Sequence, residues 1–142
     1  MNLTLEKFGY PTTCLAELDH WAILLRREQV TLGSLVLVAT ADATRYSDLP
    51  VEAFTEQGEA VRRIERALRT FVRFEKINYL MLMMVDPNPH FHVIPRYSQP
   101  RTWDGIAFSD AGWPKAPKLD AAVSLDDAQI ARLVRELSDN FR

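Results

Sequence analysis

The sequence has little of several features that mark specialised protein classes. It contains one cysteine, Cys14, so an intramolecular disulfide and a cysteine-based zinc site are excluded. Its longest apolar run, Tyr79 to Val85, is far shorter than the roughly 20 residues that cross a bilayer. The N-terminal stretch from Met1 to Tyr10 has no apolar core of signal-peptide length. We therefore expect no membrane partner and, because the sequence shows no targeting signal, a cytoplasmic location.

An excess of charge of one sign is also lacking. The 142 residues include 17 basic and 19 acidic side chains, which give a formal net charge of −2. This balance supplies no field that would attract a nucleic-acid backbone, so we expect no nucleic-acid partner. Hydrophobic residues make up 47% of the chain and charged residues 25%, proportions typical of a globular protein. The length predicts a single domain over residues 1–142.

Hydrophobic patterning in the first half of the chain predicts two strands and a long helix. The strands are expected at 20–25 and 34–39, joined by a polar connection over 26–33. The helix should begin near Pro50, because apolar residues then recur at helical spacing as far as Val72. Arginines interleave with this stripe, and we interpret them as a solvated helix face rather than a nucleic-acid patch. They are Arg62, Arg63, Arg66, Arg69 and Arg73.

Two further strands are predicted at 76–85 and 90–96, separated by a stiff turn. Pro87 and Pro89 fix the backbone and remove amide donors, so regular pairing should be interrupted between the two strands. The strands cluster along the chain and do not alternate strictly with helices. This order favours an α+β fold with an antiparallel sheet.

The segment 98–120 is rich in proline and glycine and is expected to form a loop or an extended arm. Aromatic side chains should pin this arm to the body of the protein or to a partner subunit. A final helix is expected to start at Ser124, with Asp127 as its capping-box partner. The pinning residues that we expect are Trp103, Phe108 and Trp113.

Two of the three histidines form the constellation with the most chemical potential. His90 and His92 lie two residues apart on a predicted strand, so their side chains share one face. Imidazole titrates near neutrality, and it is a competent nucleophile toward phosphorus when it is held in one tautomer. The spacing alone leaves structural, metal-binding and catalytic roles open. A zinc site would need a third and usually a fourth ligand, for which Asp86 is the only nearby acidic candidate and His20 would have to approach through the fold.

The residues around this pair resemble the signature of the histidine triad (HIT) family. The run from Lys76 to Arg96 reads KINYLMLMMVDPNPHFHVIPR. The family has, in the same order, a strand opening Lys-apolar-Asn, a proline-containing turn, and His-x-His-x-His followed by aliphatic residues and Arg. The upstream segment TLGSLVL at 31–37 resembles the family's Pro-Gly-His-Leu-Val segment. The resemblance covers about residues 15–97, with the arm and helix at 98–142 outside it.

This resemblance makes the expected fold more specific. It implies a HIT-like fold, an antiparallel sheet of about five strands with a long helix and a C-terminal helix. It also implies a homodimer in which the sheets of the two copies join, with the C-terminal arm able to cross to the partner. No obligatory metal or other cofactor is implied.

The resemblance also assigns roles to individual positions. His90 matches the nucleophile, which in the family attacks the α-phosphorus of a nucleotide and forms a nucleotidyl-histidine intermediate. His92 matches the last histidine of the triad, which contacts the phosphate. Asn88 replaces the first histidine, but its main-chain carbonyl could still hold His90 in the attacking tautomer. The candidates for phosphate or nucleotide binding are His92, Asn88, Ser34, Arg96 and Asn78.

Two of these candidates have open alternatives. Arg96 could neutralise a phosphate or could pair with an acidic side chain of the protein. Asn78 could contact a ligand or make a hydrogen bond at the edge of the sheet.

Several positions depart from the family. Ser34 stands where the family often has a phosphate-contacting histidine. Arg26 stands where many members have an aspartate that accepts hydrogen bonds from ribose hydroxyls, and an arginine cannot accept them. Met83 and Met84 replace a common Gly-Asn pair. These losses concern substrate binding more than the nucleophile.

The leading interpretation is a HIT-like hydrolase or transferase that acts through a nucleotidyl-histidine. Its substrate would be a nucleotidyl phosphoramidate, phosphoanhydride or phosphosulfate, so the expected partner is a small-molecule nucleotide or phosphorylated metabolite. One alternative is a HIT-fold module that binds such a molecule with little or no turnover. Another is a metal protein that uses His90 and His92 as ligands.

Overall fold

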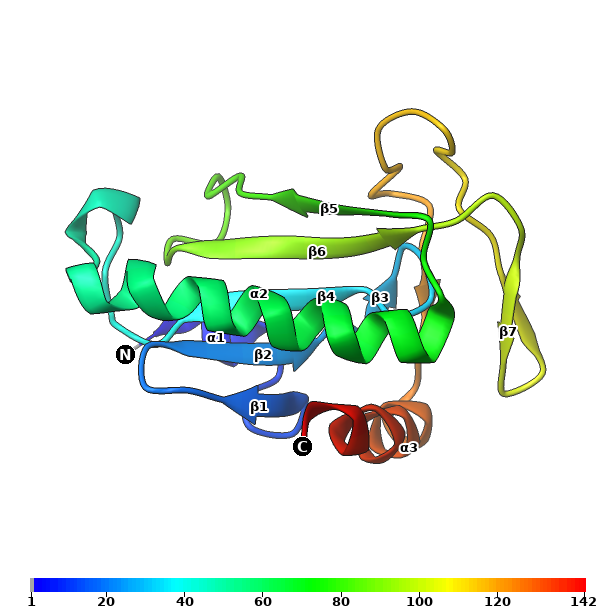
Figure 1. The fold of residues 1–142 in the computed structure, drawn as a ribbon, viewed down its shortest axis with the longest axis horizontal. Helices are drawn as coiled ribbons and strands as arrows, with labels where there is room; N and C mark the ends of the chain where they lie inside the picture. Colours follow the sequence, from blue (N-terminus) through cyan, green and yellow to red (C-terminus); the bar gives the residue numbers. More distant parts are fainter. Residues whose placement is uncertain (1) are drawn as a thin grey trace.

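A five-stranded antiparallel sheet forms the centre of the protein (Figure 1). The computed structural model describes residues 2–142, and over these residues the strands lie in the order β1-β2-β4-β6-β5. The expected α+β fold is therefore confirmed. The strands are β1 (Cys14–Glu17), β2 (Trp21–Leu25), β4 (Leu35–Ala39), β5 (Lys76–Leu80) and β6 (His90–Arg96), and the helices are α1 (Leu3–Lys7), α2 (Val51–Val72) and α3 (Asp127–Ser138).

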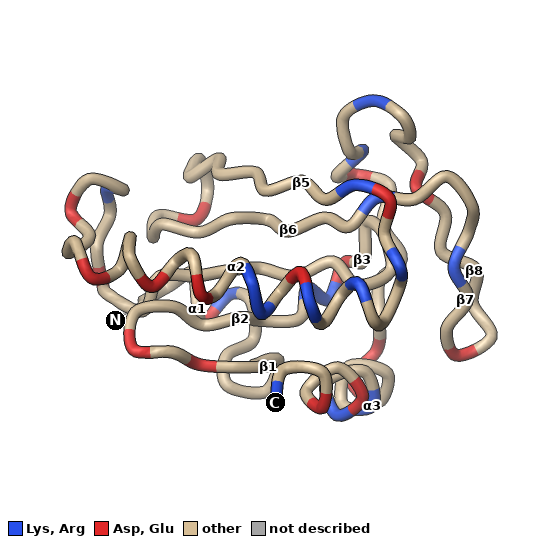
Figure 2. Tube along the Cα trace, in the orientation of Figure 1, with Lys and Arg blue, Asp and Glu red and all other residues tan. Residues whose placement is uncertain are grey.

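The long helix α2 covers one face of the sheet (Figure 1). Its apolar side buries Ile64 and Leu68 against strand residues such as Trp21 and Leu37, because alternate residues of a strand point to the same face. The expected helix is thus confirmed, although Phe54 of the predicted stripe remains 41% exposed. Basic and acidic residues interleave along the outer side of α2 (Figure 2), and Arg62 and Arg63 both pair with Glu59.

The opposite face of the sheet has a much thinner cover. Four fully buried strand residues lie there, and the N-terminal segment packs against them through Leu5, Phe8 and Tyr10, together with Cys14 of β1. The buried strand residues are Ala22, Leu24, Val36 and Val38. Strand β6 is paired so that His90 lies beside Val38 and His92 beside Val36. Both histidines therefore belong to the thinly covered face.

The connection between β2 and β4 is more structured than a simple polar loop. It contains β3 (Glu28–Gln29), which pairs with β9 (Val123–Ser124). Because Ser124 belongs to this strand pair, the expectation that it caps the last helix was wrong. The N-cap is Asp126, which forms a capping box with Gln129.

Strand β5 is shorter than the predicted 76–85, since it ends at Leu80. Met83 has a φ of 50°, which lies in the left-handed region and is incompatible with an extended strand. The chain consequently leaves the sheet at 81–85 and forms an irregular segment with exposed Leu82, Met84 and Val85. Over residues 2–142, no helix has the length and apolar character needed to cross a membrane.

The expected arm folds back on the body of the protein. It contains a hairpin of β7 (Arg101–Trp103) and β8 (Ile106–Phe108), whose turn uses Asp104 and Gly105 at φ values of 54° and 71°. Two positive φ values are typical of a type I′ turn. The Trp103 indole N–H donates to Glu136 of α3 at 2.8 Å, and α3 packs onto the same core as α2. The C-terminal part is therefore pinned to the body, as one of the two alternatives predicted.

Candidate active site

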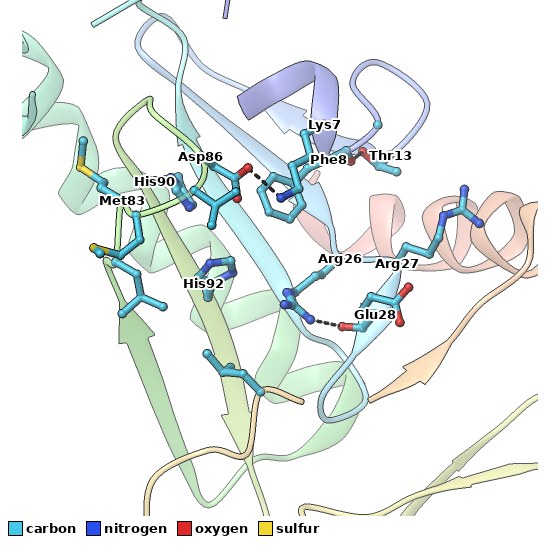
Figure 3. A pocket seen from close by; sticks show the side chains of 15 residues that line it. Lys7, Phe8, Thr13, Arg26, Arg27, Glu28, Met83, Asp86, His90 and His92 are labelled. Carbon is cyan, nitrogen blue, oxygen red and sulfur yellow. Dashed lines mark hydrogen bonds and ion pairs between the residues drawn. The ribbon is translucent and has the colours of Figure 1, made fainter. Parts of the chain in front are cut away.

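A cavity of about 590 Å³ opens on the thinly covered face of the sheet, and His90 and His92 line it (Figure 3). Segments that are far apart in the sequence meet there: the N-terminal residues from Lys7 to Gly9, the start of the β2–β4 connection, and the irregular segment before the proline turn. The cavity has an apolar part and a cationic part. The apolar part includes Phe8, Leu82, Met83, Val85 and Leu119, and the cationic side chains are Lys7, Arg26 and Arg27.

His90 is held in one orientation by the main chain. Its Nδ1 lies 2.7 Å from the carbonyl oxygen of Asn88, and the residue is 1% exposed. A carbonyl can only accept a hydrogen bond, so Nδ1 carries the proton and Nε2 keeps its lone pair. Phe8 packs beside the ring, with 6.0 Å between the centroids. This is the contact with position 88 that the sequence predicts for an attacking histidine.

The side chain of Asn88 makes hydrogen bonds within the protein and does not point into the cavity. Its Oδ1 accepts from the Thr4 amide at 3.1 Å, and its Nδ2 donates to the Ala43 carbonyl at 2.8 Å. The main-chain N–H of Asn88 in turn donates to Thr4 Oγ1 at 3.0 Å. Asn88 is 1% exposed and does not line the cavity. Its side chain therefore latches α1 onto the proline turn, and the expected ligand contact from this side chain is corrected.

A second contact closes the same junction. Lys7 forms an ion pair with Asp86 at 2.8 Å, so the N-terminal segment is tied to both ends of the turn that precedes His90 (Figure 3). Phe8 follows directly and lies against both histidine rings. Phe8 is thus placed in the cavity next to this ion pair and also packs on the apolar face of the sheet.

His92 is neutral at pH 7 and lacks a partner. Burial, together with the neighbouring positive charge of Arg26, lowers its pKa from 6.5 to about 4. The residue is 7% exposed, and its buried Nδ1 has no hydrogen-bond partner within residues 2–142. The two histidine rings are 5.1 Å apart and nearly perpendicular. A buried polar atom without a partner is unusual, and here it lies on the wall of the cavity.

Ser34 and Arg96 lie outside the cavity. Ser34 is fully buried, and its hydroxyl donates to the Thr31 carbonyl at 2.8 Å. Arg96 lies at the other end of β6, where its Nε and Nη2 contact the Asp110 carboxylate at 2.7 and 3.0 Å. Asn78 accepts from Arg96 Nη1 at 2.7 Å. The structure thus corrects the expected phosphate contacts of Ser34, Arg96 and Asn78, because internal partners already occupy these side chains.

Sequence reasoning missed the contribution of the N-terminal segment and the arm. Lys7, Phe8 and Leu119 reach the cavity only through packing between distant segments, for which no local pattern exists. Gly9, with a φ of 88°, precedes Pro11 and marks the turn that returns the chain to the sheet. His20 lies outside the cavity, where its amide donates to Glu56. Within residues 2–142, His, Cys, Asp and Glu form no group of three or more that could hold a metal ion.

Solved structures supply the comparison that sequence searches do not. No protein-family model matches the sequence, and no curated protein is significantly similar to it. A histidine triad protein from Sinorhizobium meliloti 1021 is 20% identical, with a TM-score of 0.68 over 99% of this chain and 95% of that one. Diadenosine triphosphate hydrolase from Plasmodium falciparum has the same TM-score at 9% identity, over 97% and 93% of the two chains.

The chain has the histidine triad fold. A hypothetical histidine triad nucleotide-binding protein from Sulfolobus tokodaii strain 7 agrees with this result, at 16% identity and a TM-score of 0.65 over 91% of this chain and 83% of that one. In this chain, alternate positions of the segment from Asn88 to His92 hold one asparagine, Asn88, and two histidines, His90 and His92.

Proposed function

We propose that this chain is a nucleotide phosphate hydrolase or transferase in which His90 forms a nucleotidyl-histidine intermediate. The observation that carries the proposal is the 2.7 Å contact between His90 Nδ1 and the Asn88 carbonyl. It fixes the tautomer whose free Nε2 lone pair can attack phosphorus. Nucleotide binding and diadenosine triphosphate hydrolysis appear in the names of two proteins that share the fold, and this likeness supports the same class of substrate.

The reaction needs two displacements at one phosphorus atom. In the first, His90 Nε2 forms a bond to phosphorus, and the bond to the leaving group breaks with its electron pair going to that group. In the second, a water oxygen attacks the same phosphorus, the N–P bond breaks, and the electron pair returns to Nε2. The proton that water loses passes to solvent, and the products are a nucleoside monophosphate and the released group.

The two parts of the cavity suit the two parts of a nucleotide. The apolar part, which includes Phe8 and Leu82, can bury a base, since ligand sites are commonly apolar with a few polar groups that fix orientation. The cationic part, which includes Arg26, can neutralise phosphate oxygens. His92 lies on β6 two residues beyond the nucleophile, where its single N–H could donate to a phosphate oxygen of the ligand.

Asn88 influences which leaving groups depart easily. Its side-chain amide is hydrogen-bonded to the main chain of Thr4 and Ala43, and an amide has no titratable proton to give to a departing group. An amine leaves phosphorus as a neutral molecule only after it gains a proton, whereas a phosphate leaves as a stable anion. The site therefore favours phosphoanhydrides over phosphoramidates of basic amines.

A nucleotide-binding module without turnover is the second candidate. Two observations favour it: Ser34 is buried in its own turn, and the Asn88 side chain serves as a structural latch. Neither residue is then free to help at phosphorus. The module and the enzyme differ in whether bound ligand is converted.

Turnover of adenosine 5′-phosphoramidate and of diadenosine triphosphate tests the proposal. Each substrate is incubated with the wild-type protein, with His90→Asn, and with His20→Asn as a control that removes a histidine outside the cavity. We expect adenosine monophosphate from the wild type and His20→Asn, and none above background from His90→Asn. Equal product from His90→Asn and the wild type would contradict the role of His90. Binding by calorimetry without any product would favour the module.

We also propose that two copies pair through β5. This strand is at the edge of the sheet, and an edge strand presents unpaired backbone groups to a second chain. Ile77 and Tyr79 are only half-buried there, and Leu82, Met84 and Val85 nearby are exposed. Light scattering coupled to gel filtration should give the mass of a dimer, and a monomer mass at micromolar concentration would contradict the pairing.

A further inference from the structure

Three cationic side chains reach the cavity, and two of them already have carboxylate partners. Lys7 pairs with Asp86 at 2.8 Å. Arg27 pairs with Asp127 at 2.8 Å and also donates to the Leu125 carbonyl, so its guanidinium is directed toward α3 and away from His92 (Figure 3). Arg26 forms no ion pair with any residue in 2–142. Arg26 is therefore the cavity guanidinium that has no direct carboxylate contact within residues 2–142, although the Glu28 carboxylate acts on it at longer range.

Arg26 is also poorly satisfied as a hydrogen-bond donor. Its Nη1 donates to the main-chain carbonyl of Glu28 at 2.6 Å, whereas its buried Nε has no partner among residues 2–142. The Glu28 carboxylate accepts from the Ser124 hydroxyl at 2.9 Å and does not contact the guanidinium. Burial lowers the pKa of the Arg26 guanidinium from its ordinary value, and the charge of Glu28 raises this pKa and so opposes the effect of burial. A partly buried cation with an unused donor costs free energy that a bound anion would recover.

His92 is the neighbour that makes this spot a site. It is 7% exposed, and its Nδ1 also lacks a partner. Figure 3 shows the Arg26 guanidinium and the His92 ring on the same part of the cavity wall. Two side chains that each have one buried nitrogen without a partner in residues 2–142 thus lie on the same part of the wall, and one of them is more than nine-tenths buried.

The sheet register separates this spot from the nucleophile. The Arg26 amide donates to Ser34, and the next residue of β4, Leu35, pairs with Val93 of β6. Arg26 therefore starts level with Ile94, four residues beyond His90, and a strand rises about 3.3 Å per residue. The Arg26 side chain therefore begins beyond His92, on the side away from His90.

We infer that Arg26 and His92 form a subsite for a second phosphate group, so that the preferred ligand is a nucleotide with an anionic group in addition to the phosphate bonded to His90. This inference rests on the proposed function for the placement of the first phosphate. The second phosphate can be esterified to the ribose or can continue the phosphate chain. The shared chemistry is a dianion held by a planar guanidinium fork and one imidazole donor.

Calorimetry with non-reacting protein tests the inference. Four ligands are titrated into His90→Asn, which prevents turnover: adenosine monophosphate, adenosine diphosphate, and the adenosine 2′,5′- and 3′,5′-bisphosphates. We expect at least one doubly phosphorylated ligand to bind about 10- to 100-fold more tightly than the monophosphate, the range for a hydrogen bond to a charged group. The ligand that gains most identifies the source of the second phosphate.

Arg26→Gln in the same background should abolish this preference, because it should weaken binding of the doubly phosphorylated ligand much more than binding of the monophosphate. Arg26→Lys should retain part of it, because the charge stays and the fork is lost. Arg27→Gln is the matched control, since it removes the same charge one residue away from a guanidinium that is already paired, and it should preserve the preference. Circular dichroism checks that each variant folds.

Two results would overturn the inference. One is equal affinity for singly and doubly phosphorylated ligands before Arg26 is changed, and the other is an equal loss of preference in Arg26→Gln and Arg27→Gln, which indicates a general field. Turnover by the protein with His90 intact is measured separately. His90-dependent turnover without a second-phosphate preference refutes the subsite alone, whereas a preference without turnover refutes the enzymatic proposal alone.

Discussion

The buried pair of Arg96 and Asp110 makes a sharp prediction, because sequence reasoning left Arg96 between a ligand and a structural role. The two side chains are only 4% and 1% exposed and make a two-pronged contact. The Asp110 carboxylate also accepts from the Tyr97 amide at 3.3 Å. Replacing Asp110 with Asn removes the negative charge and leaves the guanidinium buried beside a neutral amide.

We expect this change to lower the free energy of unfolding by about 3–5 kcal/mol, the usual cost of breaking a buried pair from one side. Arg96 keeps the Asn78 side chain and the Lys115 carbonyl as acceptors, which favours the lower end of that range. With a urea dependence of about 2 kcal/mol per molar, the unfolding midpoint should fall by roughly 1.5–2.5 M. Urea titrations followed by circular dichroism measure this shift.

A matched control and a binding measurement complete the test. Asp104→Asn breaks a comparable contact with Arg132, but the side chains of that pair are 28% and 46% exposed, so the unfolding midpoint should move much less than in Asp110→Asn. Nucleotide affinity of Asp110→Asn, measured well below its unfolding transition, should equal that of the wild type. A loss below about 1 kcal/mol in Asp110→Asn, or a selective loss of nucleotide affinity, would refute the structural role of Arg96.

Three further predictions concern the histidine side of the sheet and its support. Asn88→Ala leaves the buried Thr4 amide without its acceptor and should destabilise the fold by about 1–3 kcal/mol in urea titrations, and a loss below about 0.5 kcal/mol would show that the latch does not matter. The folded pKa of His92 is lowered, mainly by burial and then by Arg26 and His90, with Lys7 adding to the effect and Asp86 opposing it. The unfolded chain thus binds more protons between about pH 6.5 and 4, so stability that is present above pH 6.5 is lost as the pH falls through that window, by at most about 3 kcal/mol before solvent screening. The free energy of unfolding of His92→Gln should therefore differ less between pH 7 and pH 4.5 than that of the wild type. The same pH dependence in both proteins would contradict the assignment. Gly33→Ala should destabilise the fold by about 1–3 kcal/mol, because the φ of Gly33 is 94° and an added Cβ would meet Leu68 at 3.1 Å, and thermal unfolding at or above the wild-type temperature would contradict this expectation.

Local periodicity predicted the main elements because their burial repeats along the chain. The strand at 90–96 was expected with its observed bounds, and alternation alone placed His90 and His92 on one face. The contact of His90 with the Asn88 carbonyl was expected from the family resemblance, and the structure has it at 2.7 Å.

The parts of the site that remained unpredicted depend on contacts between distant segments. Arg96 could be assigned only when Asp110 was seen beside it, across an irregular loop with no periodic pattern. The Asn88 latch requires Thr4, which is 84 residues away in the sequence. Phe8 lines the cavity through packing of the N-terminal segment against the sheet, so no local signal identifies it as part of the site.

The cap of the last helix shows a different kind of failure. Ser124 and Asp127 have the spacing of a capping box, and so do Asp126 and Gln129. The pairing of β9 with β3 decides between them, because it holds Ser124 in extended backbone. Tertiary structure thus selects one of two locally acceptable helix starts.

Direct detection of the covalent intermediate tests the central claim most directly. The protein is mixed with adenosine 5′-phosphoramidate or diadenosine triphosphate, quenched rapidly in alkali because phosphohistidine is labile in acid, and analysed by intact mass and peptide mass spectrometry. The account predicts an adenylyl group on His90 in the wild type and in His20→Asn, and no adduct in His90→Asn. Product formation by the wild type with no adduct on His90, or with an adduct on another residue, would contradict it.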